Sequence, residues 1–213
     1  MLTLTILTFD PASPLDGRLL ALLPEGERER VSRVKRPDRA KAAALGRLLA
    51  RFVLSQAAGW SIGDIVIEYT PSGKPFSPGV VWEWNLSHTR GAAAVALSDA
   101  PVGVDIEAAA PLRPAVLERA FSKRERQYVL FDPDGRDIRF FEIWTRKEAF
   151  LKRSGRGLSG GLHTLEVLDE APGCLTTLHE GDYIVSVSAE EWLEEKNVRR
   201  LHEEAFRRLL INP

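Results

Sequence analysis

The chain has 213 residues, with 29 basic and 30 acidic side chains and a net charge of −1. With a pI near 6.5, it is not expected to bind nucleic acid by default, because binding to a phosphate backbone draws on excess positive charge. At 44% hydrophobic and 28% charged residues, the composition is typical of one globular domain or two small lobes. It is not typical of a disordered, collagen-like or coiled-coil protein.

Cysteine content and the N-terminus indicate the compartment. Cys174 is the only cysteine, so no internal disulfide can form, and the four histidines lack zinc-ligand spacing. Residues 1–9 alternate apolar side chains with threonine, which predicts a strand and not a signal peptide. No stretch approaches the roughly 18 apolar residues of a membrane span. We therefore expect a soluble, cytoplasmic protein with no membrane partner.

The first half is predicted to run from this strand into a long helix and then into strands. A turn-rich loop at 11–17 and a helix-forming stretch at 19–23 lead to residues 25–51, which carry nine basic and four acidic side chains. Apolar residues at helical spacing predict a helix over 38–58 that ends near Gly59. Strands are expected over 65–69, 81–86, 92–97 and 102–107.

The second half repeats this order. Short helices are expected over 115–121 and 122–130, followed by a longer helix over 137–153. Strands are then expected over 164–168, 174–179 and 183–188. Each half thus has a long helix, a glycine-bearing loop and strands, which predicts an α+β protein of two similar lobes. The tail over 189–210 is expected to be a helix docked on a lobe, with a partner-binding helix as the alternative.

Two glycine patterns between residues 155 and 161 have the spacing of a dinucleotide-binding loop and of a hydrolase nucleophile turn. Both kinds of site need a strand before the glycines and a helix after them. Here a predicted helix comes first and a predicted strand follows, so we reject both functions.

Acidic residues at two places suggest chemistry. In a strand, Asp105 and Glu107 share one face because side chains alternate. In the helix over 137–153, Glu148 falls on an apolar stripe, with Lys152 one turn beyond. A carboxylate on such a stripe needs a partner, since burying it unpaired is costly. The partner of Glu148 could be Lys152, in an ion pair, or a metal ion shared with other acids, and the sequence leaves both alternatives open.

Three acids that can converge suit a hard dication such as Mg²⁺, which takes few carboxylates and completes its shell with water and substrate phosphate. Basic residues of 28–51, Lys74 and Lys152 are available for phosphate contacts. Carboxylates together with cations, in a chain without a P-loop, indicate phosphate-group chemistry.

Several segments occur in a fixed order with fitting intervals: Ser72-Gly73-Lys74-Pro75, Trp84-Asn85-Leu86-Ser87-His88-Thr89, Gly103-Val104-Asp105-Ile106-Glu107, Trp144-Thr145-Arg146-Lys147-Glu148-Ala149 and Gly155-Arg156-Gly157-Leu158. Together they resemble the 4′-phosphopantetheinyl transferase superfamily. The chain is most similar to its monomeric two-lobed type, which activates peptide synthetases such as surfactin synthetase and polyketide synthases. The resemblance covers about residues 25 to 170.

The resemblance implies a pseudo-duplicated α+β fold, with lobes at 1–102 and 103–213, each a small antiparallel sheet packed on a long helix. It also implies a monomer that transfers the 4′-phosphopantetheine group of coenzyme A to a serine of an apo acyl or peptidyl carrier protein. In that reaction the serine attacks the β-phosphate and 3′,5′-ADP leaves. Coenzyme A is expected between the lobes, with Mg²⁺, or Mn²⁺ as an alternative, on its pyrophosphate.

Residue roles follow from the same resemblance. Asp105, Glu107 and Glu148 are expected to hold the metal, with Glu148 also the general base and Lys152 neutralising charge on the phosphates. The residues expected to contact coenzyme A are Lys74, Ser87, His88, Arg33, Arg36, Asp105 and Lys152. The chain departs from the family at Ala42, Ala43 and Ala44, where relatives often carry polar residues. Which of Arg30, Arg33, Arg36, Arg39 or Arg47 compensates is open.

Two further hypotheses compete with a transferase. One is a catalytically silent module that binds carrier proteins, against which the intact acids argue. The other is a Mg²⁺-dependent nucleotide hydrolase in which water replaces the serine.

Overall fold

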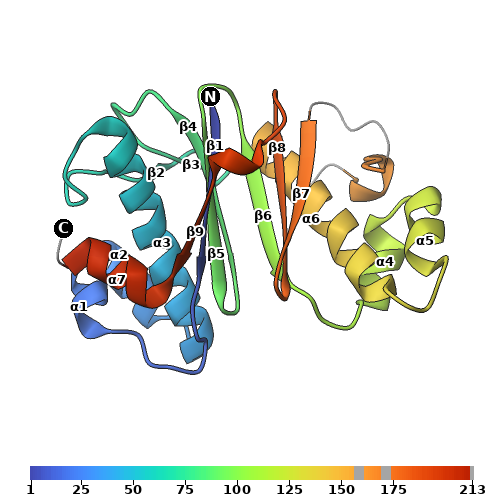
Figure 1. Cartoon of the computed structure of the whole chain (residues 1–213), viewed down its shortest axis with the longest axis horizontal. Coiled ribbons are helices and arrows are strands. Elements are labelled where there is room, and N and C mark those ends of the chain that lie inside the picture. Colours follow the sequence, from blue (N-terminus) through green and yellow to red (C-terminus); the bar gives the residue numbers. More distant parts are fainter. Residues whose placement is uncertain (156–160, 169–173, 212–213) are drawn as a thin grey trace.

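Two lobes lie side by side, each with its helices on the outside and its sheet toward the middle of the molecule (Figure 1). The computed structural model describes residues 1–155, 161–168 and 174–211. Within them, no helix has the length and apolar character needed to cross a membrane.

The first lobe is a four-stranded sheet in the order β4-β5-β1-β9. Its strands are β1 (Leu2–Thr8), β4 (Glu83–Thr89), β5 (Ala92–Ser98) and β9 (Val198–His202). The long helix α3 (Pro37–Ala58) packs on this sheet and ends at Gly59, whose φ of +68° favours glycine. Around it lie α1 (Gly17–Ala21), α2 (Glu25–Ser32), α7 (Glu203–Ile211) and the small hairpin of β2 (Glu68–Tyr69) and β3 (Pro75–Phe76).

The second lobe is a three-stranded antiparallel sheet in the order β6-β8-β7. Its strands are β6 (Gly103–Ala108), β7 (Cys174–Glu180) and β8 (Tyr183–Ala189). The long helix α6 (Arg136–Ser154) packs on it, preceded by α4 (Pro114–Ala120) and α5 (Lys123–Leu130). Ser122 and Glu125 begin α5 with a reciprocal capping box.

The two sheets share an apolar core between the lobes. Leu4 and Ile6 of β1 lie in it with Val104 and Ile106 of β6, together with Val185 and Val187 of β8. Strand β5 is buried on both faces: Ala93, Val95 and Leu97 belong to the core under α3, and Ala92, Ala94 and Ala96 to the core between lobes. Because neighbouring residues of a strand face opposite sides, one alternating strand serves both cores. The expected two lobes, each with a long helix on a small sheet, are confirmed.

Residues 189–210 do not form the expected helix. After β8 the chain passes through the short 3₁₀ helix η3 (Glu195–Asn197), forms β9 parallel to β1, and only then enters α7. Without β9, the backbone N–H and C=O groups along the outer edge of β1 would have no hydrogen-bond partners. A strand can pair with such an edge, whereas a helix cannot. The first sheet is therefore mixed and not purely antiparallel. The division at 102/103 stays a prediction, while residues 198–211 lie against the first lobe.

Two contacts hold this returning segment. The ammonium of Lys41, only 1% exposed, donates to Glu203 Oε2 at 2.8 Å, to Ser13 Oγ at 2.6 Å and to the Asp10 carbonyl at 2.8 Å. Phe206 of α7 packs edge-on against Phe52 of α3, with ring centroids 5.6 Å apart. The C-terminal segment is thus part of the first lobe's core.

The strand expected over 164–168 is also absent. Leu162–Thr164 forms the 3₁₀ helix η2, and residues 165–168 join no sheet. A buried ion pair supplies their hydrogen bonds instead: Lys147 Nζ donates to the carbonyls of Leu162 and Leu165, and Glu125 Oε1 accepts from the Val167 amide at 3.1 Å. Lys147 and Glu125 lie 2.8 Å apart and are fully buried. Burial raises the pKa of Glu125 and lowers the pKa of Lys147.

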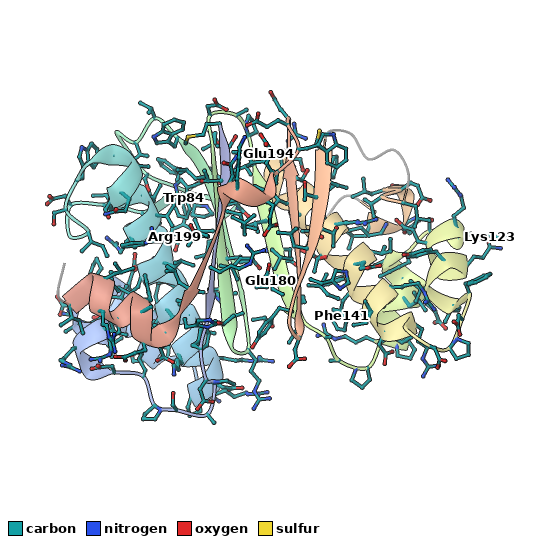
Figure 2. The ribbon with its side chains drawn as sticks, in the orientation of Figure 1. Trp84, Lys123, Phe141, Glu180, Glu194 and Arg199 are labelled. Carbon is teal, nitrogen blue, oxygen red and sulfur yellow. The ribbon has the colours of Figure 1, made fainter. Side chains whose placement is uncertain are left out.

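Replacing Lys147 by Met should destabilise the second lobe strongly. The change leaves Glu125 buried without its cation and frees two carbonyls, for which we expect a loss of about 3 to 5 kcal/mol in the free energy of unfolding. Urea unfolding measures it. Lys123→Met, at the exposed outer end of the second lobe (Figure 2), is the control and should change stability by less than about 0.5 kcal/mol. Equal unfolding midpoints for the two variants would contradict the expectation.

Candidate functional site

The candidate site lies where one edge strand of each sheet approaches the other sheet. Strand β4 of the first lobe runs beside β6 of the second, and α6 packs on β6. The Asn85 side chain joins the two strands, its Oδ1 accepting from the Val104 amide at 3.1 Å. Residues from both lobes therefore face one another across a fixed boundary.

Lys152 of α6 crosses this boundary. Its Nζ lies 2.6 Å from Asp105 Oδ1, 2.9 Å from Ser87 Oγ and 3.2 Å from the Val104 carbonyl. The Ser87 hydroxyl donates to the same Asp105 oxygen at 2.8 Å. A lysine ammonium has three N–H donors, so these three acceptors use all of them. The ion pair that the sequence left open for Lys152 is therefore made with Asp105 and not with Glu148.

Three carboxylates share this boundary and repel one another. Burial and the charges of Asp105 and Glu107 raise the pKa of Glu148 to about 7, against a smaller lowering by Lys152. Burial and the charge of Asp105 also raise the pKa of Glu107, although Thr89 donates to its Oε2 at 3.2 Å. Among the described residues, none forms a hydrogen bond or ion pair with Glu148, and Asp105 Oδ2 is buried without a partner.

The carboxylates of these acids are the ligand type that a hard cation prefers, but they are not clustered in the arrangement of a metal site. In the ranges that the structure describes, no three His, Cys, Asp or Glu side chains are gathered to hold a metal ion as they stand. An orphaned carboxylate oxygen and two carboxyls with raised pKa values are nevertheless groups that positive charge stabilises. Asp105, Glu107 and Glu148 thus fit a dication by donor type and by charge.

The backbone of β6 touches α6 at Gly103. A Cβ at this position would overlap the carbonyl oxygen of Ala149 and the amide nitrogen of Arg153. Only glycine allows this approach, which places Asp105 within reach of Lys152 one turn along the helix. The glycine that begins the Gly-Val-Asp-Ile-Glu segment therefore positions the acids.

Two adjoining clefts open at the boundary. The first, of about 250 Å³, is lined by Lys74, Asn85, Glu148 and Lys152 with neighbouring residues of the 72–75 loop. The second, of about 340 Å³, is lined by Arg47, Tyr69, Ser87, His88 and Lys152 among others. Pro75, Leu86 and Lys152 line both. An extended ligand can therefore pass from Glu148 in one cleft to Arg47 in the other.

His88 rests on α3 at a second glycine. A Cβ on Gly46 would lie 3.2 Å from His88 Cδ2, so the absent side chain makes room for the ring. Protein packed around the ring, followed by the charges of Arg47 and Lys152, lowers the pKa of His88 to about 4. Because the residue as a whole is exposed, we attribute the lowered pKa of His88 mainly to the charges of the two cations. The ring is therefore neutral at pH 7.

Most residues that the sequence singled out meet at this boundary. Asp105, Glu107, Glu148, Lys152 and Ser87 lie together, while Lys74 and His88 line different clefts. Arg33 and Arg36 line neither cleft: Arg33 pairs with Glu29 at 3.5 Å, and Arg36 binds Asp38 through two hydrogen bonds. Residues 156–160, which complete the last matched segment, lie outside the described residues.

Sequence reasoning gave no role to Asn85, although it lies inside a matched segment, and did not separate Arg47 from four other arginines. The one signal in the sequence that could have singled out Arg47 was its position. Arg47 directly follows Gly46, on the helix where three successive alanines stand in place of the polar residues that relatives often carry. Only the packing of His88 on that helix shows which arginine faces the cleft.

Comparisons with known proteins give consistent matches over both lobes. Residues 101–202 match the family model of the 4′-phosphopantetheinyl transferase superfamily, and residues 10–100 match that of the N-terminal part of a 4′-phosphopantetheinyl transferase. The 4′-phosphopantetheinyl transferase psf-1 of Bacillus pumilus is 38% identical over 125 residues, covering 58% of this chain and 54% of the relative. The transferases ffp and Sfp of Bacillus subtilis are 32% and 31% identical over 152 residues, covering 70% of this chain and 68% of each relative.

A solved structure gives a weaker match. The holo-[acyl-carrier-protein] synthase of Thermotoga maritima aligns over 41% of this chain and 60% of its own, at 20% identity and a TM-score of 0.35. At that TM-score the likeness supports no conclusion about this chain.

Replacing Gly103 by Ala should disturb the boundary. The new methyl group overlaps helix backbone, so α6 must move away from β6, and we expect a loss of about 1 to 3 kcal/mol in stability. Thermal unfolding measures it, with Gly17→Ala as the control, because nothing lies within 4 Å of a Cβ built there. A Gly103→Ala protein as stable as the Gly17→Ala protein would show that the close approach is not needed.

Proposed function

The chain belongs to the 4′-phosphopantetheinyl transferase superfamily, as a transferase of the Sfp type, and from this we propose its reaction in detail. It transfers the 4′-phosphopantetheine group of coenzyme A to a serine hydroxyl of an apo acyl or peptidyl carrier protein and releases 3′,5′-ADP. We propose that it acts as a monomer, because both halves of the site come from one chain. We also propose that it acts in the cytoplasm.

The observation that carries the proposal is the unbalanced charge at the lobe boundary. Within the described ranges, Glu148 lines a cleft without a partner, and Asp105 Oδ2 is buried without one. Leaving such groups uncompensated is costly, so a site that keeps them is suited to a positively charged ligand. Asp105, Glu107 and Glu148 would hold Mg²⁺, or Mn²⁺ as the alternative. The bound ion would supply charge neutralisation at the pyrophosphate of coenzyme A.

Glu148 is the best placed base. A serine oxygen that attacks the β-phosphorus must lose its proton, while the bond from phosphorus to the departing 3′,5′-ADP oxygen breaks. Glu148 faces the cleft, and none of the described residues places a cation or donor on its oxygens, so it can accept that proton directly or through a water. Glu148 is also a proposed metal ligand, and both roles need its negative charge.

Lysines at the same cleft serve the phosphates. Lys152 reaches the cleft while it holds Asp105, so a phosphate oxygen can replace the Ser87 hydroxyl or the Val104 carbonyl among its acceptors. Lys74 lines the cleft too, and its ammonium lies 3.4 Å from the exposed Glu83. An ion pair with one solvent-exposed partner is weak and easily exchanged. The contacts expected of Arg33 and Arg36 with coenzyme A stay predictions.

Incubation with coenzyme A, Mg²⁺ and several apo carrier proteins tests the proposal. A carrier that gains the mass of one phosphopantetheine supports transfer. Loss of coenzyme A with an unmodified carrier indicates a hydrolase, and no change in either indicates a silent carrier-binding protein. Each of these last two outcomes, obtained with the full panel, contradicts the proposed reaction.

Glu148→Gln should abolish turnover without unfolding the protein. Gln keeps the shape but loses the charge and cannot accept a proton, so the single-turnover rate should fall by about 10² to 10⁴-fold. No lysine is stranded, since Lys152 keeps Asp105. Glu142→Gln on the same helix, whose carboxylate contacts Tyr128 and His179, is the matched control and should retain the wild-type rate. A folded Glu148→Gln protein with more than about a tenth of that rate contradicts a catalytic role.

The pH dependence of stability offers a second readout of Glu148. Its pKa in the folded protein, about 7, lies above the ordinary value of 4.5. The protonated carboxyl therefore favours folding at low pH, and this stability is lost as the pH rises through about 7. In the presence of a chelator, the melting temperature of Glu148→Gln should fall less between pH 5 and pH 8 than that of the wild type. Parallel profiles would show that the carboxyl is not desolvated.

A further inference from the structure

A groove of about 400 Å³ lies on the first lobe, between the C-terminal half of α3 and the part of the sheet formed by β1 and β9. Its apolar wall consists of Phe52, Val53 and Ala57 of α3, Leu97 of β5 and Val198 of β9. The groove shares no described lining residue with either cleft at the lobe boundary. The proposed transfer of phosphopantetheine therefore makes no use of it.

Thr5 of β1 and Arg199 of β9 line the groove side by side. The two residues are paired across the sheet, so their side chains project from the same face. The Arg199 guanidinium lies over the Phe52 ring of α3, 5.1 Å from its centroid, and Figure 2 shows the residue between β9 and α3. The face that carries Thr5 and Arg199 is therefore the one that α3 covers.

The Thr5 hydroxyl is a polar group that the fold leaves without a partner. Only 7% of the residue is exposed, and no described residue forms a hydrogen bond with its side chain. Its backbone pairs with β5 on one side and with β9 on the other, so the hydroxyl is the group that lacks a bond. Burying a hydroxyl without a hydrogen bond is costly. A polar ligand in the groove can supply the missing bond.

The charge of Arg199 is also uncompensated. Within residues 1–155, 161–168 and 174–211, no carboxylate pairs with Arg199, whereas the adjacent Arg200 faces the other way and pairs with two glutamates. Lys196 and Met1 line the groove as well, but the ammonium of each is paired with a carboxylate. None of the described lining residues is Asp or Glu. The groove therefore has one guanidinium available to an anion.

A single guanidinium favours a carboxylate over a phosphate. A phosphate monoester carries a charge of about −1.5 to −2 at pH 7, which one arginine does not match. A carboxylate carries one negative charge, and its two oxygens fit the arginine fork. A carboxylate oxygen can also accept a hydrogen bond from the Thr5 hydroxyl.

The remaining surface favours an aliphatic chain behind that carboxylate. Four aliphatic side chains form most of the apolar wall, and the Phe52 ring is already covered by Arg199 and contacted edge-on by Phe206. An apolar cavity of about 150 Å³ holds one benzene ring, so a groove of this size has room for a chain of about eight to ten carbons.

We propose that this groove is a binding site for an aliphatic monocarboxylate of medium chain length. The carboxylate binds the Arg199 guanidinium and the Thr5 hydroxyl, and the chain lies along the apolar wall of α3. The proposal is independent of the transferase function.

Isothermal calorimetry on the full chain with octanoate, 1-octanol and octylammonium tests the site, because the three probes share a chain and differ in the charge of the head group. We expect octanoate to bind at least about 10-fold more tightly than either of the others, as hydrogen bonds to charged groups allow. Hexanoate, with two fewer methylenes to bury, should bind about 10-fold more weakly than octanoate. Saturating coenzyme A should leave the affinity for octanoate within about 2-fold.

Three variants separate the contributions. Arg199→Ala should lower the affinity for octanoate by about 10-fold and leave that for 1-octanol within about 2-fold. Thr5→Val keeps the shape and removes the hydroxyl, so it should lower the affinity for octanoate by about 3-fold or more, and it stays informative if Arg199→Ala fails to fold. Arg208→Ala is the control and should bind octanoate as the wild type does, because Arg208 pairs with Glu204 on α7 and lies outside the groove.

Any of three results overturns the proposal. The first is a wild type that binds octanoate no more tightly than 1-octanol and octylammonium. The second is an affinity for octanoate that both Arg199→Ala and Thr5→Val leave unchanged. The third is displacement of octanoate by coenzyme A, which would place the carboxylate in the clefts at the lobe boundary. Failure of the transferase function alters none of these measurements, since they need no carrier protein and no turnover.

Discussion

Lys152 reaches from α6 across the lobe boundary to Asp105 and Ser87, and the arrangement of the site depends on that contact. It ties a helix of the second lobe to strands of both sheets at 2.6 and 2.9 Å. Because Asp105 takes the lysine, Glu148 one turn earlier has no partner among the residues that the structure describes. A single ion pair thus decides which carboxylate is structural in the free protein and which is available to a ligand.

Charge is distributed unevenly between the two clefts in a chain that is nearly neutral as a whole. Glu148 lines the first cleft beside Lys74 and Lys152, whereas no Asp or Glu is among the described lining residues of the second. Glu148, whose pKa is raised by burial and by the charges of Asp105 and Glu107, lies in the first cleft, and Arg47 and the neutral His88 ring lie in the second. Local placement of charge, and not net charge, therefore determines which ligand charges each cleft can accommodate.

Close backbone approaches hold this separation in place. Gly103 lets β6 touch α6, and Gly46 lets the His88 ring lie on α3. Both sites of contact join a strand at the boundary to the long helix of its own lobe. The two sheets pack on each other through small and branched apolar side chains. Because α3 and α6 each pack on the sheet of their own lobe, the polar residues of both helices reach the same boundary.

The sequence by itself determined the two long helices, most of the strands and the segment that bears Asp105 and Glu107, because periodicity and glycine signals are local. It also indicated Glu148 and Lys152 by their place on an apolar stripe. Only the tertiary structure decided the partners: Lys152 pairs with Asp105 and Lys147 with Glu125. It also placed β9 before α7 in the tail where the sequence predicts one helix, because β9 pairs with β1, a strand nearly 200 residues away in sequence. Pairings between distant residues depend on which surfaces the fold brings together, and no local pattern carries that information.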